Sequence, residues 1–388
     1  MHILKLIFKN SFRHKLRTYL TILGITIAIL AFGLLRTVIS AWYAGVEASS
    51  ATRLVTRNSI SLVFHLPISY KDKIRQIPGV KIVSYGNWFG GVYINEKNFF
   101  PNFAVEPKSY LKLYPEIVLP PEQQTAFMRD RKGFVAGRKL AAKYGWKIGD
   151  TITLKGTIFP GNWEFVLRGI YKGRDKTVDE TQFFFNWDYL NEALKKNAPL
   201  WSDRSNQVGF YMIGVTNPHI AADVAAAIDK TFKNSLAETL TETEKAFQMG
   251  FVSMSEAIVI AIQLVSFVVI IIILAVVANT MAMTARERFV EYAVFKTLGF
   301  GKWHITALIF GESLFITMTG CALGMVLTFP SAKAFGNEMS TFFPIFNVST
   351  KTIYLDIAVS IIVGTAAAIL PTWRAINIRI AEGLRSIG

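Results

Sequence analysis

The residues whose types and spacing most clearly suggest a chemical role form a charged stretch after the longest apolar run of the sequence. They are Arg286, Glu287, Arg288, Glu291, Lys296 and Gly299. Side chains three or four residues apart meet on one face of a helix, so Arg288 and Glu291 can form an ion pair. Lys296 suits the negative end of a helix dipole, and Gly299 is typical of a helix C-terminus. The stretch therefore predicts a charged helix that continues the preceding apolar run over 281–299 and keeps this segment in water on the cytoplasmic side.

No catalytic or metal-binding pattern accompanies this stretch. His65 and His219 lack metal-ligand spacing, and neither a His-Glu-x-x-His nor a Gly-x-Ser-x-Gly motif occurs. The single cysteine, Cys321, cannot form an intrachain disulfide. No Walker A sequence is present, because the glycine required upstream of Gly301-Lys302 is missing. We expect no catalytic residues, no metal and no bound cofactor in this chain, so any ATP and magnesium would belong to a partner ATPase.

Four apolar segments are long enough to cross a membrane, which takes roughly 20 residues. They are 19–35, 257–278, 305–329 and 353–370. Pro330 and Pro371 follow the last two segments and are expected to end them. The composition agrees, because 52% of the residues are apolar and only 18% are charged, whereas a soluble domain has about 25% charged residues.

The charge distribution predicts the orientation of these spans. Lys and Arg dominate the short segments 1–17, 286–302 and 372–388, which are therefore expected to be cytoplasmic. The net charge of +15 is explained in this way rather than by nucleic-acid binding, since no zinc-finger or RNA-binding signature is present. In residues 1–18, apolar side chains fall on one helical face and basic side chains on another. This pattern favours an amphipathic interfacial helix over a cleaved signal peptide.

The long insert between the first two spans has the mixed composition of a folded α/β domain. Its expected helices are 70–77, 138–144 and 220–232, and its expected strands are 80–85, 91–94, 150–154, 164–171, 183–185 and 210–216. Residues 236–254 are helix-friendly and could extend the second span as a stalk. The predicted fold class is a membrane α-helical protein with four transmembrane helices and a large α/β extracytoplasmic domain between helices one and two.

These expectations divide the chain into nine segments. They are a cytoplasmic amphipathic helix (1–18), transmembrane helix 1 with a stalk (19–43), the extracytoplasmic domain (44–250), a stalk with transmembrane helix 2 (251–284), a cytoplasmic coupling helix (285–304), transmembrane helix 3 (305–329), an outer loop (330–352), transmembrane helix 4 (353–371) and a cytoplasmic tail (372–388).

Polar groups inside the spans are candidates for function, because they are costly in a bilayer. They are Glu312, Gln263, Arg36 and Asp356. Glu312 is the costliest of them, and we expect it to pair with a basic group near the cytoplasmic ends, with proton or substrate handling as the alternative. Gly320 and Gly324 form a Gly-x-x-x-Gly pair that suits close helix packing, within one subunit or across a dimer.

Residues 287–300 resemble the stretch that follows the second span of MacB-type ABC permeases. Those permeases tend to carry an acid at the place of Glu291, a basic residue at that of Lys296 and Leu-Gly at those of 298–299. Four further segments are similar to recurring parts of the family: 77–80, 135–141, 148–152 and 371–375. The resemblance covers nearly the whole chain, from the basic N-terminal helix to the basic tail.

The resemblance implies a type VII, mechanotransmission permease in the cytoplasmic (inner) membrane, with both termini cytoplasmic. Such permeases form homodimers that bind two copies of a separate ABC ATPase, with membrane lipids, a periplasmic adaptor and an outer-membrane channel as further partners. The charged stretch would couple ATP hydrolysis to movement of the outer domain. This movement would export or extract a lipid, lipoprotein, peptide or drug-like substrate from the outer side. The alternatives are an ATPase-driven signalling protein that activates an extracytoplasmic partner without transport, and an outer-domain enzyme on a membrane anchor.

Overall fold

The computed structural model describes residues 2–196, 204–339 and 343–378, so residues 379–388 of the expected tail lie outside it. The chain forms two compact units. The helical unit comprises Met1–Ala41, Ser255–Glu338 and Phe346–Gly388, and the α/β unit comprises Trp42–Met254 and Met339–Ile345. The expected outer loop 330–352 is thus divided between the two units.

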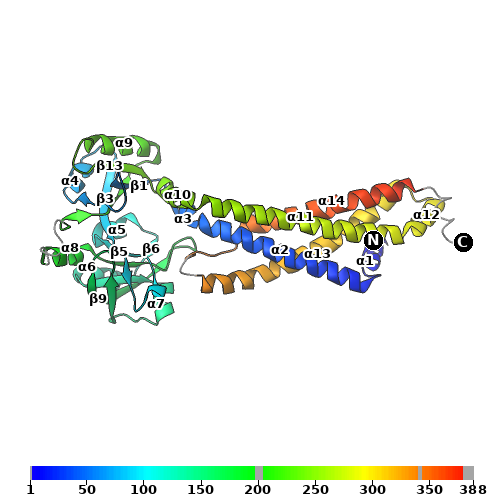
Figure 1. Cartoon of the computed structure of the whole chain (residues 1–388), viewed down its shortest axis with the longest axis horizontal. Helices are drawn as coiled ribbons and strands as arrows, with labels where there is room; N and C mark the ends of the chain where they lie inside the picture. The colour runs from blue at the N-terminus through cyan, green and yellow to red at the C-terminus, as the bar shows by residue number, and fades with distance from the viewer. Residues whose placement is uncertain (1, 197–203, 340–342, 379–388) are drawn as a thin grey trace. The chain divides into compact units, whose positions relative to one another are not determined.

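The helical unit is built from long apolar helices that lie side by side (Figure 1). Its helices are α1 (His2–Ser11), α2 (Lys15–Trp42), α11 (Glu256–Glu287), α12 (Phe289–Thr297), α13 (Lys302–Glu338) and α14 (Thr350–Asn377). Within the described ranges, four of them are long and apolar enough to cross a membrane: α2, α11, α13 and α14. Their core joins isoleucines of α2, such as Ile25 and Ile29, to Val277 of α11, Ile316 of α13 and Val363 of α14.

Three expected helix boundaries are wrong. Residues 1–18 do not form one helix, because a turn after Ser11 separates α1 from α2. Helix α13 continues past Pro330 to Glu338, and α14 continues past Pro371 to Asn377. Proline removes one backbone donor, but membrane helices tolerate it where neighbouring groups satisfy the freed carbonyl. Pro371 is itself buried in the packed bundle, so packing outweighs the local preference.

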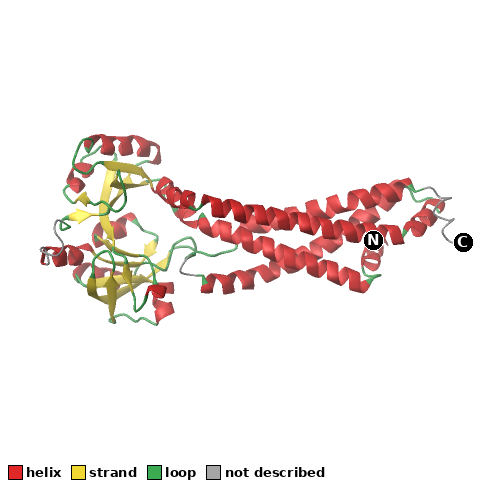
Figure 2. Cartoon of the chain, in the orientation of Figure 1, coloured by secondary structure: helices red, strands yellow, loops and turns green. Residues whose placement is uncertain are grey.

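The α/β unit is organised around one mixed sheet, and Figure 2 shows the strands gathered in this unit. In the described residues the sheet has eleven strands, ten of them in the order β13-β1-β12-β3-β5-β10-β7-β9-β8-β4, with β6 paired to β9. The strands are β1 (Arg53–Asn58), β2 (Leu66–Pro67), β3 (Val80–Trp88), β4 (Gly91–Val92), β5 (Asn102–Val105), β6 (Ile117–Val118), β7 (Gly133–Gly137), β8 (Thr151–Gly156), β9 (Gly161–Gly173), β10 (Phe183–Asn186), β11 (Gln207–Val208), β12 (Phe210–Val215) and β13 (Thr239–Thr243). β2 and β11 form a separate pair.

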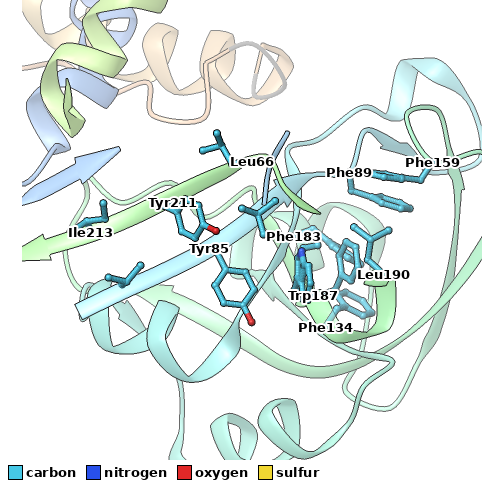
Figure 3. Close-up of a cluster of buried hydrophobic side chains, with 14 of the residues drawn as sticks. Leu66, Tyr85, Phe89, Phe134, Phe159, Phe183, Trp187, Leu190, Tyr211 and Ile213 are labelled. Carbon is cyan, nitrogen blue, oxygen red and sulfur yellow. The ribbon is translucent and has the colours of Figure 1, made fainter. Parts of the chain in front are cut away.

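Helices cover this sheet and bury an aromatic core. They are α3 (Ala44–Ala48), α4 (Tyr70–Arg75), α5 (Pro107–Leu113), α6 (Pro121–Arg129), α7 (Arg138–Tyr144), α8 (Trp187–Lys196), α9 (Ala221–Thr231) and α10 (Glu244–Met254), with short 3₁₀ turns at Glu96–Asn98 and Pro218–Ile220. Figure 3 shows part of the core, in which Phe89 and Phe159 are stacked with ring centroids 6.1 Å apart. The expected buried strand at 183–185 is confirmed as β10. The ring of Phe183 in this strand stacks on that of Phe134, with the ring centroids 4.1 Å apart.

The expected helical stalk over 236–254 is wrong in its first half. Residues Thr239–Thr243 form β13, and only Glu244–Met254 are helical. Alternating threonines favour a strand, because β-branched side chains pack well on a pleated surface. Thr241 pairs across the sheet with Thr56 of β1, and their hydroxyl oxygens are 2.9 Å apart.

Candidate functional site

Helices α11 and α12 meet at Arg288, which is the C-cap of the first and the N-cap of the second. The backbone of Arg288 has φ −105° and ψ 10°, so the continuous helix expected over 281–299 is broken there. The guanidinium is buried, with 5% of the side chain exposed. The break therefore turns a charged side chain into the protein at the point where the longest apolar run ends.

The Arg288 guanidinium forms a buried ion pair inside the helical unit. Its Nη1 donates to Oε2 of Glu312 at 2.8 Å, and its Nη2 donates to the carbonyl of Asn10 at 2.7 Å. The expected pair of Arg288 with Glu291 is wrong, whereas the expected pairing of Glu312 with a basic group is found. Buried charges are tolerated when they are paired and their remaining donors are satisfied. One side chain thus connects α1, the α11–α12 junction and α13.

More exposed ion pairs surround this buried pair. Arg17 donates two hydrogen bonds to the carboxylate of Glu287, at 2.8 and 2.6 Å. His14 lies 3.5 Å from the same carboxylate, and Arg13 pairs with Glu291. Exposed pairs stabilise a fold only weakly, but these link the start of α2 to both sides of the junction. Arg286, by contrast, is exposed.

The side chain of Lys296 forms hydrogen bonds with the C-terminal end of α14. Its ammonium group donates to the carbonyls of Ile376 at 2.9 Å and Ile378 at 2.8 Å. These carbonyls belong to the C-terminal end of α14, where a cation also suits the helix dipole. Burial lowers the pKa of Lys296, and the nearby charge of Lys302 lowers it further. Lys296 therefore joins α12 to α14 instead of facing a partner.

Gly299 ends α12 in the way that its sequence predicts. Its φ of +88° lies in the left-handed region that favours glycine. The amide of Gly299 donates to the carbonyl of Lys296 at 3.1 Å, and that of Phe300 donates to Phe295 at 2.9 Å. This pair of bonds is a Schellman motif, and the contact of the Phe295 and Phe300 rings at 5.4 Å completes it.

An exposed apolar surface that was not predicted from the sequence lies just after α12. Leu298 is 69% exposed, Phe300 43% and Trp303 79%; we call these three residues the tip. The opposite side of α12 is packed, because Tyr292 and Ala293 are buried against α13 and α14. The sequence does contain a run of apolar residues around two glycines at this position. The run was overlooked because it directly follows the charged stretch.

The remaining intramembrane candidates do not form one site. Gln263 is exposed on α11, Arg36 is half-buried on α2, and Asp356 is buried on α14 with 1% exposed. In the described part of the chain, Arg36 and Asp356 form no ion pair with each other. The described residues also contain no cluster of three or more His, Cys, Asp or Glu that could hold a metal ion.

Gly320 and Gly324 pack against α2 within the same chain, which resolves the alternative left open by the sequence. A Cβ added at Gly320 would lie 2.6 Å from Cγ2 of Ile25, and one at Gly324 would lie 2.8 Å from Cβ of Ile29. Neither distance is compatible with a side chain unless α2 moves. The Gly-x-x-x-Gly pair therefore brings α13 close to α2.

We expect Gly320→Ala to destabilise the helical unit, by about 1–3 kcal/mol, because the added methyl group overpacks this contact. Gly24→Ala on α2 is the control, since no described atom outside the local backbone of α2 lies within 4 Å of its added Cβ. That substitution should be neutral or stabilise the helix by up to about 1 kcal/mol. Thermal unfolding of the purified chain in detergent measures both effects, and equal melting temperatures for the two variants would contradict the packing assignment.

Comparison with known proteins places the junction inside a known domain. Residues 264–380 match the family model of the FtsX-like permease C-terminal domain. This match runs from α11 through α12 and α13 to the end of α14. The chain is also 26% identical over 341 residues to an uncharacterised ABC transporter permease of Methanocaldococcus jannaschii, covering 82% of this chain and 81% of the relative.

Two solved structures are similar to part of the chain. The extracellular domain of the noncanonic ABC-type transporter YknZ from Gram-positive bacteria has 9% identity and a TM-score of 0.34, covering 49% of this chain and 100% of that domain. The periplasmic region of MacB from Actinobacillus actinomycetemcomitans has 8% identity and a TM-score of 0.37, covering 53% of this chain and 95% of that region.

Proposed function

We propose that this chain, whose residues 264–380 match the FtsX-like permease C-terminal domain and which is similar to an ABC transporter permease, is itself a MacB-like permease. It would couple ATP hydrolysis by a separate ATPase to movement of its α/β unit. Two ATPase copies would bind a permease homodimer in the cytoplasmic membrane, with both termini of the permease on the ATPase side. The movement would export or extract a lipid, lipoprotein, peptide or drug-like substrate from the outer side. The observation that carries the proposal is the environment of α12. One side of this helix is packed against α13 and α14, whereas the residues at its end are apolar and exposed.

The tip supplies the docking surface for the ATPase in this proposal. Exposed aromatic side chains that insert into a partner's pocket dominate the energetics of protein interfaces. Trp303 and Leu298 are the most exposed of the tip residues, and both flank the turn that ends α12. The charged residues expected to dock, such as Glu291 and Lys296, are bound within the chain instead.

The internal bonds of α12 would transmit the ATPase movement. Lys296 attaches α12 to α14, Arg288 attaches the junction to α13, and the Arg13–Glu291 pair attaches α12 to the segment before α2. A displacement of the tip would therefore be shared by the four long helices α2, α11, α13 and α14, since the junction at Arg288 also ends α11. Two of these, α2 and α11, lead along the chain into the α/β unit.

We expect the double variant Leu298→Ser/Trp303→Ser to lose the ATPase. Removing two apolar anchors should reduce the amount of ATPase recovered with the tagged full chain at least tenfold, since hot-spot residues each contribute about 2 kcal/mol or more. ATP hydrolysis by the membrane fraction should fall in parallel. Quantitative mass spectrometry of the purified complex, in gentle detergent with trapped nucleotide, measures the recovery.

Val326→Ser/Ile362→Ser is the matched control, because these residues are 67% and 64% exposed on the apolar helices α13 and α14. It removes two exposed apolar side chains away from the tip and should leave ATPase recovery within twofold of the wild type. If both double variants retain the ATPase equally, the tip is not the docking surface. If the wild-type chain itself recovers no ATPase, the proposed function fails.

A further inference from the structure

The α/β unit contains a cavity of about 1150 Å³ that the coupling proposal does not use. It is lined by α4, the start of β3, α5 and the segment after β9, together with Gly45 of α3 and Gln248 of α10. All of these residues belong to the same compact unit. Sites for small molecules measure about 300–1000 Å³, so this cavity is larger than any single inorganic ion requires.

Six cationic side chains lining the cavity form no ion pair with any other described side chain. They are Lys71, Arg75, Lys81, Lys108, Lys112 and Arg174. Among the described residues, none of them forms a side-chain hydrogen bond or an ion pair, although the Lys71 ammonium lies over the Tyr85 ring at 4.9 Å. The positive charge of the cavity is therefore available to a ligand.

The carboxylates that line the same cavity are already engaged by the protein. Glu116 and Glu244 bind Arg53 at 2.7 and 2.8 Å. Glu106 accepts a hydrogen bond from the Ser109 amide at 2.9 Å, where it caps α5. The other two, Asp175 and Asp179, accept hydrogen bonds from Thr177 and Thr181. None of these five carboxylates forms an ion pair with the six cations in the described part of the chain, although the charge of Arg174 acts on the neighbouring Asp175.

The arrangement of the cations favours an extended anion. Lys108 and Lys112 are one helical turn apart on α5, and Lys71 and Arg75 are one turn apart on α4. Cations gathered on a concave wall focus a positive potential that attracts anionic ligands. Lysine and arginine are also the side chains that bind phosphate oxygens most strongly.

Apolar side chains lie between the cationic groups. Ile82, Ile117 and Val178 line the cavity and are each partly exposed. A ligand that combines phosphate with carbon would satisfy both kinds of surface. A small inorganic ion would leave the apolar lining and most of the volume unused.

We propose that this cavity, the basic groove, binds a phosphate-bearing ligand of the size of a phospholipid headgroup. Its source is either a membrane lipid or a soluble phosphate ester, since the groove recognises chemistry that the two share. Gly45, which lines the groove, follows the last residue of α2 by only three positions. The inference concerns binding by the α/β unit and holds whether or not an ATPase drives the chain.

The test uses the full chain purified in a maltoside detergent, with two probes. The soluble probe is glycerophosphoglycerol, titrated by calorimetry, and the lipid probe is dioleoylphosphatidylglycerol, whose retention is measured by native mass spectrometry against a neutral diacylglycerol. The variant is Lys108→Glu/Lys112→Glu, in which both side chains are exposed. Lys147→Glu/Lys155→Glu is the control, because it makes the same charge change at exposed positions of the α/β unit outside the groove.

We expect the groove variant to weaken binding at least tenfold and the control to change it less than twofold, with circular dichroism unchanged in both. Loss confined to the lipid probe supports a membrane lipid as the ligand, and loss confined to the soluble probe supports a phosphate ester. Binding of neither probe by the wild type overturns the proposal, as does equal weakening by the groove and control variants. These outcomes are independent of ATPase recovery, so this inference and the proposed function can fail separately.

Discussion

Arg53→Met is expected to lower the free energy of unfolding of the α/β unit by about 3–5 kcal/mol, because it leaves buried carboxylates without their cation. Arg53 lies on β1 with 7% of its side chain exposed, and Glu244, the first residue of α10, has 9% exposed. The guanidinium also stacks on the Tyr114 ring at 4.2 Å and binds Glu116. Burial acts to lower the pKa of Arg53, but the charges of Glu244 and Tyr114 and the hydrogen bonds to Glu116 and Glu244 outweigh it and raise the pKa overall.

The loss of stability in Arg53→Met should be largest where the cluster of Arg53, Glu116 and Glu244 joins elements that are far apart in the sequence. Glu244 also accepts hydrogen bonds from the Ser50 amide at 2.8 Å and the Tyr114 hydroxyl at 3.1 Å. Losing Arg53 should therefore release the start of α10 from β1. Hydrogen-exchange mass spectrometry of the full chain should show faster exchange in β1 and α10, together with a lower melting temperature.

Arg57, four positions further along the same strand, provides a matched control. It pairs with Glu242 at 3.3 Å, but their side chains are 21% and 26% exposed. A more exposed pair contributes about 0–1 kcal/mol, so Arg57→Met should change stability little. The variant Arg53→Met/Glu244→Gln should recover part of the loss, since it removes one uncompensated charge. Equal melting temperatures for Arg53→Met and Arg57→Met would contradict the assigned role of the cluster.

The order of the major elements was predictable from the sequence because the apolar spans and the alternating strands are long local patterns. The ends of helices were less predictable. Pro330 and Pro371 read locally as stop signals, yet both lie inside helices. Thr239–Thr243 lies in a segment that reads as helical, but β1 provides a strand with which it pairs. In each case, packing against a distant element outweighed the local preference.

The candidate site was predictable in its position but not in its contacts. The three-residue spacing favoured a pair of Arg288 with Glu291, which is a local interaction. The actual partners, Glu312 for Arg288 and Arg13 for Glu291, are 24 and 278 residues away. The helix break at Arg288 changes the direction of the side chain, and no local pattern specifies that break. The local cap at Gly299 was predictable because its geometry depends on neighbouring residues alone.

We expect Glu312→Leu to destabilise the helical unit more than any single substitution among the exposed ion pairs. It leaves the Arg288 guanidinium buried without its carboxylate partner, while the bond to the carbonyl of Asn10 remains. Removing one partner of a buried pair costs about 3–5 kcal/mol, which corresponds to a fall of about 10 °C in melting temperature for a unit of this size. Glu312→Gln, which keeps an acceptor, should fall between the wild type and Glu312→Leu.

The double variant Arg288→Met/Glu312→Leu separates stability from coupling. Replacing both charges with apolar side chains of similar volume is often neutral, so most of the melting temperature should return. The bond from Arg288 to Asn10 would still be absent, and α1 would lose a polar attachment to the junction. Under the proposed function, ATPase recovery should then be preserved because the tip is intact, while substrate-stimulated ATP hydrolysis falls. A double variant that regains both stability and full stimulation would show that the buried pair only maintains the fold, and that the exposed pairs and Lys296 are sufficient for transmission.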